Sequence, residues 1–358
     1  MLRRIRHFFP DFKRRLIQFS QKKNVYLIIS GSAISFMERE ILSEKSPLFG
    51  RRTNQIFLKP FDYLDAAKFV SKYSNEEKAI VYGVTGGVAK YLTLFDDSVS
   101  LDQNLIEQFF KPSGYLYEEP HNLLIQEFRT VNTYNAVIEA CSNGANKVNE
   151  IADKANVSSA ALTYILSNLT TVGVISKVTA ITEEKNKKKI NYEIADGMYR
   201  FWYRFVPAGR AAIEMDRGEV YYDSYVKKNL HSFMGEIFET MCRHYLLAQG
   251  LDGNLNCLIT NVGKWWGKGH DNVPTDIDVV GIDSLTKKVI LGECKFKNEP
   301  IDKNVYEDLM KRKGLINHKF EEAQFILFSL SGFTEWVKEN ADSERTKLLT
   351  LDDLYSVE

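Results

Sequence analysis

The sequence has few cysteines and no long apolar run, and both absences exclude classes of protein. The four cysteines form no CxxC pair, so we expect neither a zinc site built on paired cysteines nor a disulfide framework. We interpret them as small core residues in a reducing compartment. They are Cys141, Cys242, Cys257 and Cys294. No stretch approaches the roughly 18 continuous apolar residues of a membrane span.

A signal peptide is not indicated either, because the basic start of the chain lacks the apolar segment and the cleavage site that would follow it. We therefore expect a cytoplasmic protein with no membrane partner. The length of 358 residues is sufficient for two or three domains.

The chain also lacks an excess of charge of either sign, since Lys+Arg and Asp+Glu both number 47. Net charge therefore indicates no class of partner. The local distribution is uneven, because residues 1–23 carry eight Lys or Arg against one acid. A second basic run consists of Lys185, Lys187, Lys188 and Lys189. Such runs are usually solvated faces, and contact with nucleic acid is the alternative.

The first third of the chain predicts one strand followed by helices. Residues 24–30 are rich in Val and Ile and predict a buried strand of the parallel type. Helical patterns follow over 35–42, 62–74, 76–82 and 101–128. Breaks are expected at Gly86 and Gly87 and near 112–114.

Residues 130–194 predict a winged helix-turn-helix. Three helices are expected over 133–141, 147–155 and 160–171, the last capped by Ser158 or Ser159. A hairpin follows, with strands over 174–182 and 190–194 and a charged tip between them. Three helices and such a β-wing are the parts of this motif.

The third helix and the tip of the wing would be the parts that touch DNA. We expect Lys187, Lys188 and Lys189 to contact phosphates and Thr163 to lie on the outer face of the third helix. This face is polar but carries no Arg or Lys. A winged helix used for packing against protein is therefore an open alternative.

A helix over 231–247 is predicted to carry one acid beside the core. At 100° per residue, Glu236 points away from the apolar stripe, whereas Glu239 lies nearer its border. Glu239 is therefore the better candidate for a site carboxylate. Trp265 and Trp266 follow this helix, and they pack in a core or, as the alternative, stack on bases.

Two alternating segments after this helix, 275–283 and 288–297, predict a hairpin with a turn over 284–287. With this register Asp283 lies opposite Lys288, and Asp278 lies opposite Glu293. Alternation of side chains places Asp276 and Lys295 on the same face. Three acids and one lysine are thus expected to meet on one surface.

Clustered carboxylates repel one another unless a cation joins them. Carboxylate oxygens suit Mg²⁺, which activates a bound water, and a lysine stabilises the developing charge. The spacing of Asp278, Glu293 and Lys295, with Glu239 upstream, resembles the PD-(D/E)XK superfamily of restriction-endonuclease-like folds. We therefore expect Asp278 and Glu293 as metal ligands and all four residues as catalytic. The alternative is a degenerate site in which Lys295 pairs with the acids as a structural salt bridge.

Motifs along nearly the whole chain resemble an archaeal and prokaryotic family of AAA-type ATPases. They include LIISGSAISFMERE (27–40), YGVTGGVAKYL (82–92) and the segments MGEIFE, TDIDVVG and GECK around the candidate site. The resemblance implies an ATP-binding core, a helical lid, a winged helix and a nuclease-like domain. It also implies nucleotide or subunit contacts for Ser32, Arg51 and Arg52.

One departure from that family is the P-loop, since no GxxxxGK[ST] stretch is present. We therefore expect an N-terminally truncated member with no independent ATP hydrolysis. The domains expected are a partial ATPase core (1–75), the lid (76–128), the winged helix-turn-helix (129–200) and the nuclease-like domain (201–358).

The fold class expected is multidomain α/β, and the function expected is DNA binding with Mg²⁺-dependent cleavage. Three alternatives are open. The first is a non-catalytic nucleic-acid-binding or regulatory protein. The second is a chain that binds ATP only within a homo-oligomer or beside another chain that completes the core. The third is a gene remnant.

Overall fold

The structure is a computed structural model that describes residues 28–31, 33–34, 37–44, 46, 49–50, 53–183, 186, 189–316 and 319–356. Some of the predicted features lie outside these residues. They are the basic segment 1–23, most of the strand over 24–30, the implied nucleotide or subunit contacts Ser32, Arg51 and Arg52, and the wing residues Lys185, Lys187 and Lys188.

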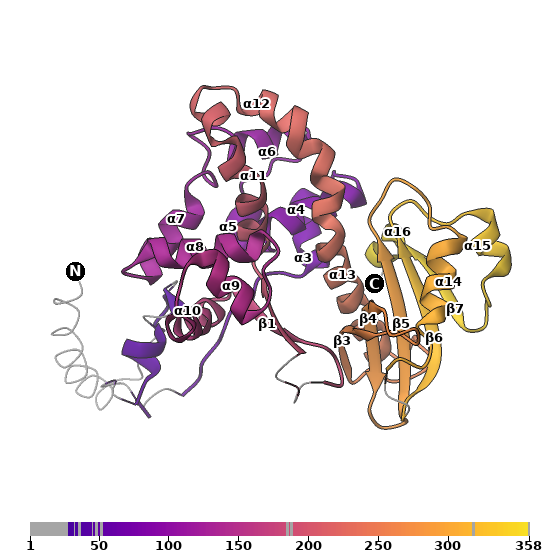
Figure 1. The fold of residues 1–358 in the computed structure, drawn as a ribbon. Helices are drawn as coiled ribbons and strands as arrows, with labels where there is room; N and C mark the ends of the chain where they lie inside the picture. The colour runs from indigo at the N-terminus through magenta and orange to yellow at the C-terminus, as the bar shows by residue number, and fades with distance from the viewer. Residues whose placement is uncertain are drawn as a thin grey trace, which may run out of the picture.

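Described residues before 130 form mainly short helices, as predicted. The described end of the expected buried strand, residues 28–30, is exposed and forms no strand. They are η1 (Met37–Leu42), α3 (Tyr63–Ala67), η2 (Lys68–Val70), α4 (Asn75–Thr85), α5 (Ala89–Leu92), α6 (Leu101–Phe109) and α7 (Glu119–Glu127) (Figure 1). Helix α4 starts with a capping box, in which Ser74 and Glu77 each accept a hydrogen bond from the other's backbone N–H. It ends at Gly86 in the left-handed conformation. The predicted break at this glycine is confirmed.

Residues 131–194 contain the predicted three helices and antiparallel hairpin. The elements are α8 (Val131–Ser142), α9 (Val148–Ala155), α10 (Ser159–Thr171), β1 (Ile175–Thr179) and β2 (Ile190–Ile194). Ser158 caps α10 by accepting a hydrogen bond from the N–H of Ala161. The two strands pair with Ile175 opposite Ile194. This is the element order expected of a winged helix-turn-helix.

An aromatic helix joins the helical region to the C-terminal part of the chain. The elements are α11 (Gly197–Glu214), α12 (Gly218–Tyr221), η4 (Tyr222–Val226) and α13 (Lys227–Leu251). The ring of Phe201 in α11 lies 4.6 Å from that of Phe109 in α6 and 5.3 Å from that of Phe233 in α13. These edge-to-face contacts fix α6, α11 and α13 around one core. Helix α13 then runs from the helical region to the sheet (Figure 1).

The C-terminal part contains a mixed five-stranded sheet in the order β3-β4-β5-β6-β7. The elements are β3 (Asn261–Lys268), β4 (Pro274–Asp283), β5 (Lys288–Lys295), α14 (Lys303–Lys311), β6 (Glu321–Ser329), α15 (Glu335–Asn340), β7 (Thr346–Thr350) and α16 (Leu351–Tyr355). Strands β3, β4 and β5 are antiparallel neighbours, whereas β5, β6 and β7 run parallel. The chain is therefore α/β, with a helical region followed by a mixed sheet.

Both faces of the sheet are covered by helices. Val279 and Ile290 share a core with Phe238 of α13. The next residues along the same strands, Val280 and Leu291, belong to a second core that contains Leu309 of α14. Alternate side chains thus serve opposite faces, with α13 on one side of the sheet and α14 and α15 on the other (Figure 1).

Candidate functional site

The hairpin of β4 and β5 has the predicted register. Asp283 lies opposite Lys288, the turn spans 284–287, and the pairing continues to Val279 opposite Gly292. The backbone pairing of the two strands ends there. Beyond it the side chain of Asp278 contacts β5, because its Oδ2 accepts a hydrogen bond from the N–H of Cys294 at 3.0 Å. Asp278 therefore lies beside the Glu293 end of β5, as the register predicts.

Asp278 sits in an environment that opposes its negative charge. Burial has the largest effect, and the negative charges of Glu293 and Glu239 add to it, so that the pKa of Asp278 rises to about 7. Lys295 and the N–H of Cys294 act in the opposite direction. An acid with a pKa near 7 in such a place marks a candidate functional group.

Glu293 is buried, with 6% of its surface exposed, and its carboxylate is paired with two cations. Nζ of Lys295 lies 2.5 Å from its Oε1. Arg312, the first residue after α14, donates a hydrogen bond from Nη1 to its Oε2. Although burial opposes the charge on Lys295, Glu293 and Asp278 raise the pKa of that ammonium group.

Glu239 lies on α13 closer to the core than Glu236, as the helical pattern predicts. The side chain of Glu239 is 21% exposed, whereas that of Glu236 is 64% exposed and pairs with Arg200 at 3.1 Å. Burial raises the pKa of Glu239, and Arg243 opposes this effect. Nη1 of Arg243 donates to the Glu239 carboxylate at 3.3 Å and to the backbone carbonyl of Asp278 at 2.8 Å.

Asp276 is exposed near the outer end of β4, opposite Trp266 of β3. In the part of the chain that the structure describes, no group of three or more His, Cys, Asp or Glu side chains is arranged to hold a metal ion. The carboxylates brought together are Asp278 and Glu293, with Glu239 close enough to affect the pKa of Asp278. Mg²⁺ is commonly bound through one or two carboxylates with water completing its shell, and Asp278 and Glu293 are the pair with this donor chemistry.

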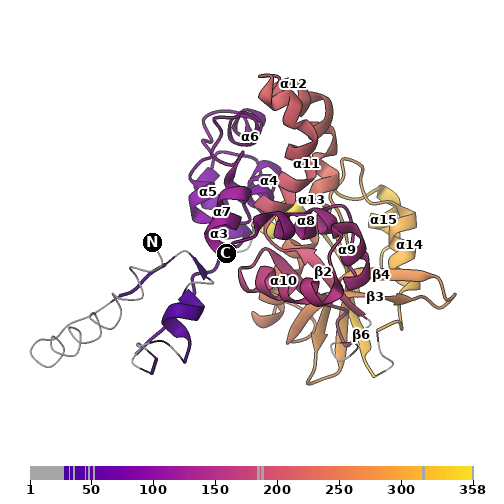
Figure 2. The same ribbon diagram turned by 60° about the vertical axis from the view of Figure 1, so that its left-hand side comes forward.

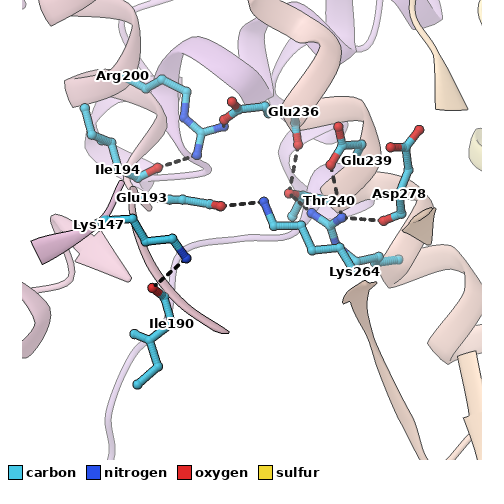
Figure 3. A network of polar contacts seen from close by, with 11 residues as sticks. Lys147, Ile190, Glu193, Ile194, Arg200, Glu236, Glu239, Thr240, Lys264 and Asp278 are labelled. Carbon is cyan, nitrogen blue, oxygen red and sulfur yellow. Dashed lines mark hydrogen bonds and ion pairs between the residues drawn. The ribbon is translucent and has the colours of Figure 1, made fainter. Parts of the chain in front are cut away.

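The hairpin of β1 and β2, which is the predicted wing, packs against the sheet close to this site. Ala180 and Ile181 are fully or almost fully buried in the core that contains Trp265. The N–H of Ile181 donates to the carbonyl of Lys264 at 2.9 Å. Nζ of Lys264 lies 2.5 Å from Glu193 of β2, so an ion pair joins the two parts (Figure 3). Figure 2 shows β2 beside β3.

Two of the predicted DNA contacts, Lys189 and Thr163, lie within the described residues, and their surroundings differ. Lys189 pairs with Glu183 at 3.2 Å, and its ammonium group lies 5.3 Å from the ring centre of Trp265. Thr163 is exposed on α10 as expected, and its hydroxyl donates to the carbonyl of Ser159. Beside it, Tyr164 is 64% exposed. This aromatic residue on the outer face of α10 was not among the predicted contacts.

The four cysteines are free thiols. Cys242 and Cys294 are buried behind the site, and burial raises the pKa of both. A raised thiol pKa lowers the fraction of the nucleophilic thiolate, which agrees with a packing role. Among the described residues, no helix has the length and apolar character needed to cross a membrane.

The site thus belongs to an α/β domain with acids and a lysine on a central hairpin. Residues 202–313 match the DUF234 family, described as archaea bacterial proteins of unknown function. The C-terminal part of the chain therefore carries a DUF234 domain, and the matched range includes Glu239, Asp278, Glu293, Lys295 and Arg312.

One curated relative is an uncharacterized protein of Methanocaldococcus jannaschii. It is 30% identical over 294 residues, which are 81% of this chain and 64% of the relative. The chain therefore spans less than two thirds of the length of that relative. No solved structure matches the chain.

Proposed function

We propose that this protein binds DNA and cleaves phosphodiester bonds with Mg²⁺ at the site formed by Asp278, Glu293 and Lys295. The observation that supports the proposal most is the pair of neighbouring carboxylates on β4 and β5, with the lysine two residues beyond Glu293. Burial and the neighbouring acids oppose ionisation of Asp278, and a divalent cation would relieve that repulsion.

The chemistry follows from the donor set. Asp278 and Glu293 would hold the ion, which supplies a water of lowered pKa and polarises the phosphate. Lys295 would stabilise negative charge as it develops on the phosphate oxygens. Glu239 would complete the acidic wall of the site from α13. The N–H of Cys294 holds the Asp278 carboxylate in place during these steps.

DNA binding would use the winged helix beside this site. The ion pair between Lys264 and Glu193 and the burial of Ile181 hold the wing against the sheet. DNA that contacts α10 or the wing would therefore lie near the hairpin. We propose Thr163 together with Lys187, Lys188 and Lys189 as contacts, because hydroxyl and ammonium groups bind phosphates without reading sequence.

The motifs shared with AAA-type ATPases lead to a further part of the proposal. We propose that the chain is related to those ATPases and binds ATP only within a larger assembly, a homo-oligomer or a complex with another chain. Ser32, Arg51 and Arg52 would contact the nucleotide or the neighbouring subunit. This part rests on the sequence motifs alone.

A non-catalytic DNA-binding protein is the second candidate, and one observation favours it. Both oxygens of Glu293 are paired, one with Lys295 and the other with Arg312. This is the salt-bridge arrangement expected of a degenerate site. The candidates differ in one result, since only the first one cuts DNA.

The deciding experiment is nicking of supercoiled plasmid by the full chain in Mg²⁺ or Mn²⁺. Wild-type protein should nick the plasmid, and Lys295→Ala should reduce the rate by at least about 100-fold, as loss of a group that stabilises the transition state does. Lys338→Ala is the control, because Lys338 pairs with Glu335 on exposed helix α15. Nicking that survives Lys295→Ala would rule out this site.

A further inference from the structure

Arg312 contacts the proposed site, but the proposed reaction gives this residue no role. It follows the last residue of α14, and its side chain is only 16% exposed. Its Nη1 donates to Oε2 of Glu293, while Lys295 takes Oε1. Each oxygen of one proposed metal ligand is therefore paired with a cation.

The preceding basic residue, the last residue of α14, behaves differently. Lys311 is 72% exposed at its side chain and pairs with Asp308, three residues earlier, at 2.7 Å. Arg312 instead turns toward the sheet, to a residue 19 positions earlier in the chain. Its ion pair therefore depends on how α14 packs against β5, and it is a property of the folded site.

A divalent ion at the proposed site would compete with Arg312 for Glu293. The ion would need an oxygen of this carboxylate, and a positive guanidinium group beside it would repel the ion. A guanidinium group that leaves Glu293 would be buried without a partner, which is costly unless it finds another anion. Its planar set of five N–H donors matches the oxygens of a phosphate.

We propose that Arg312 exchanges partners: it pairs with Glu293 in the metal-free protein and binds a DNA phosphate when a divalent ion takes Glu293. The inference rests on the proposed function and adds a positioning residue to it. Metal binding and DNA binding are then coupled, because the ion releases the group that holds the phosphate. Coupling of this kind is reciprocal, so DNA also favours metal binding.

The first test is calorimetric titration of the full chain with Mn²⁺ in the absence of DNA. Arg312→Gln should bind Mn²⁺ about 10-fold more tightly than wild type, because the competing charge is gone. Lys311→Gln, the matched control, should bind as wild type does. Circular dichroism confirms that each variant is folded, and Arg312→Lys, which keeps the positive charge, should bind close to wild type.

The second test measures the affinity for a DNA duplex by fluorescence anisotropy with and without Ca²⁺, another ion that takes oxygen ligands. Ca²⁺ should tighten DNA binding by wild type and by Lys311→Gln. The gain should be about 10-fold smaller in Arg312→Gln, because this variant cannot form the charge-assisted hydrogen bonds to the phosphate.

The outcomes distinguish a failure of the partner exchange from a failure of the metal site. If wild type binds Mn²⁺ and Arg312→Gln binds it equally or more weakly, the exchange is wrong while the metal site stands. An equal Ca²⁺ gain in wild type and Arg312→Gln also overturns the exchange. If no folded variant and no wild-type protein binds Mn²⁺, the metal site itself is wrong, and the exchange is overturned with it.

Discussion

The N–H of Cys294 donates a hydrogen bond to Oδ2 of Asp278 at 3.0 Å, at the point where the β4–β5 ladder ends. The carboxylate of Asp278 thus accepts a hydrogen bond that a backbone carbonyl of β4 would accept if the ladder continued. This contact ties the position of one proposed metal ligand to the strand that carries the other, Glu293.

Asp278→Asn should make the stability of the protein less dependent on pH. The pKa of Asp278 is raised from 3.8 to about 7 in the folded protein. Between these values the folded state binds more protons than the unfolded chain, so the free energy of unfolding falls as the pH rises through this window. Asparagine carries no charge and still accepts from Cys294. The free energy of unfolding of Asp278→Asn, relative to that of wild type, should therefore rise by about 2 kcal/mol from pH 5 to pH 8.

Urea denaturation at pH 5, 6.5 and 8 checks this prediction in metal-free buffer. Lys338→Ala, which alters a surface pair in α15, should show the pH dependence of wild type. An advantage of Asp278→Asn that is the same at all three pH values would mean that Asp278 ionises normally.

The contact between wing and sheet should be measurable as a coupling between Glu193 and Lys264. Their side chains are 24% and 22% exposed and 2.5 Å apart. A double-mutant cycle with Glu193→Gln and Lys264→Met should give a coupling of about 1 kcal/mol in the free energy of unfolding. The exposed pair Glu335 and Lys338 should give close to zero. Equal couplings would show that the wing contact adds no stability.

Charge reversal at the wing tip should weaken DNA binding in a manner that depends on salt. Replacing Lys187, Lys188 and Lys189 with Glu removes up to three ammonium groups that would neutralise phosphates. The slope of log K against log[salt] should then fall in magnitude by up to about 2.7, that is about 0.9 for each phosphate that is no longer neutralised. Anisotropy titrations between 50 and 300 mM NaCl, with Lys338→Glu as control, measure this slope. An unchanged slope would favour a wing that serves only for packing.

Cys294→Ala should leave cleavage nearly intact despite its position between Glu293 and Lys295. The thiol is buried and faces Cys242 and α13. Its N–H, which holds Asp278, is unaffected by the substitution. The free energy of unfolding should fall by about 1–2 kcal/mol because a small cavity forms. Plasmid nicking and urea denaturation of the same sample separate these effects, and a loss of nicking in folded protein would assign a role to the thiol.

Local features of the site could be predicted from the sequence. The turn length set the hairpin register, because side chains alternate and a slip by one residue would reverse the faces of Asp278 and Glu293. Helical periodicity distinguished Glu239 from Glu236. Both features depend on neighbours within one element or one hairpin, where geometry is regular.

Features set by packing between distant elements could not be predicted. The pairing of Arg312 with Glu293 depends on the path of the chain between β5 and α14. The burial of Ile181 depends on the wing meeting β3. Helix α11 was missed because its aromatic residues are buried around much of its circumference and Pro207 lies inside it, so the usual polar face is weak. Strand β3, with its two glycines and polar residues, likewise lacks a clear alternating pattern.

The central claim is that Asp278 and Glu293 together hold a divalent ion. Calorimetric titration of the full chain with Mn²⁺ tests it most directly, with wild type compared with Asp278→Asn and Glu293→Gln. We predict one ion per chain in wild type and at least about 10-fold weaker binding in each variant, since each variant has one charged ligand fewer. Equal binding by folded wild type and both variants would contradict the claim.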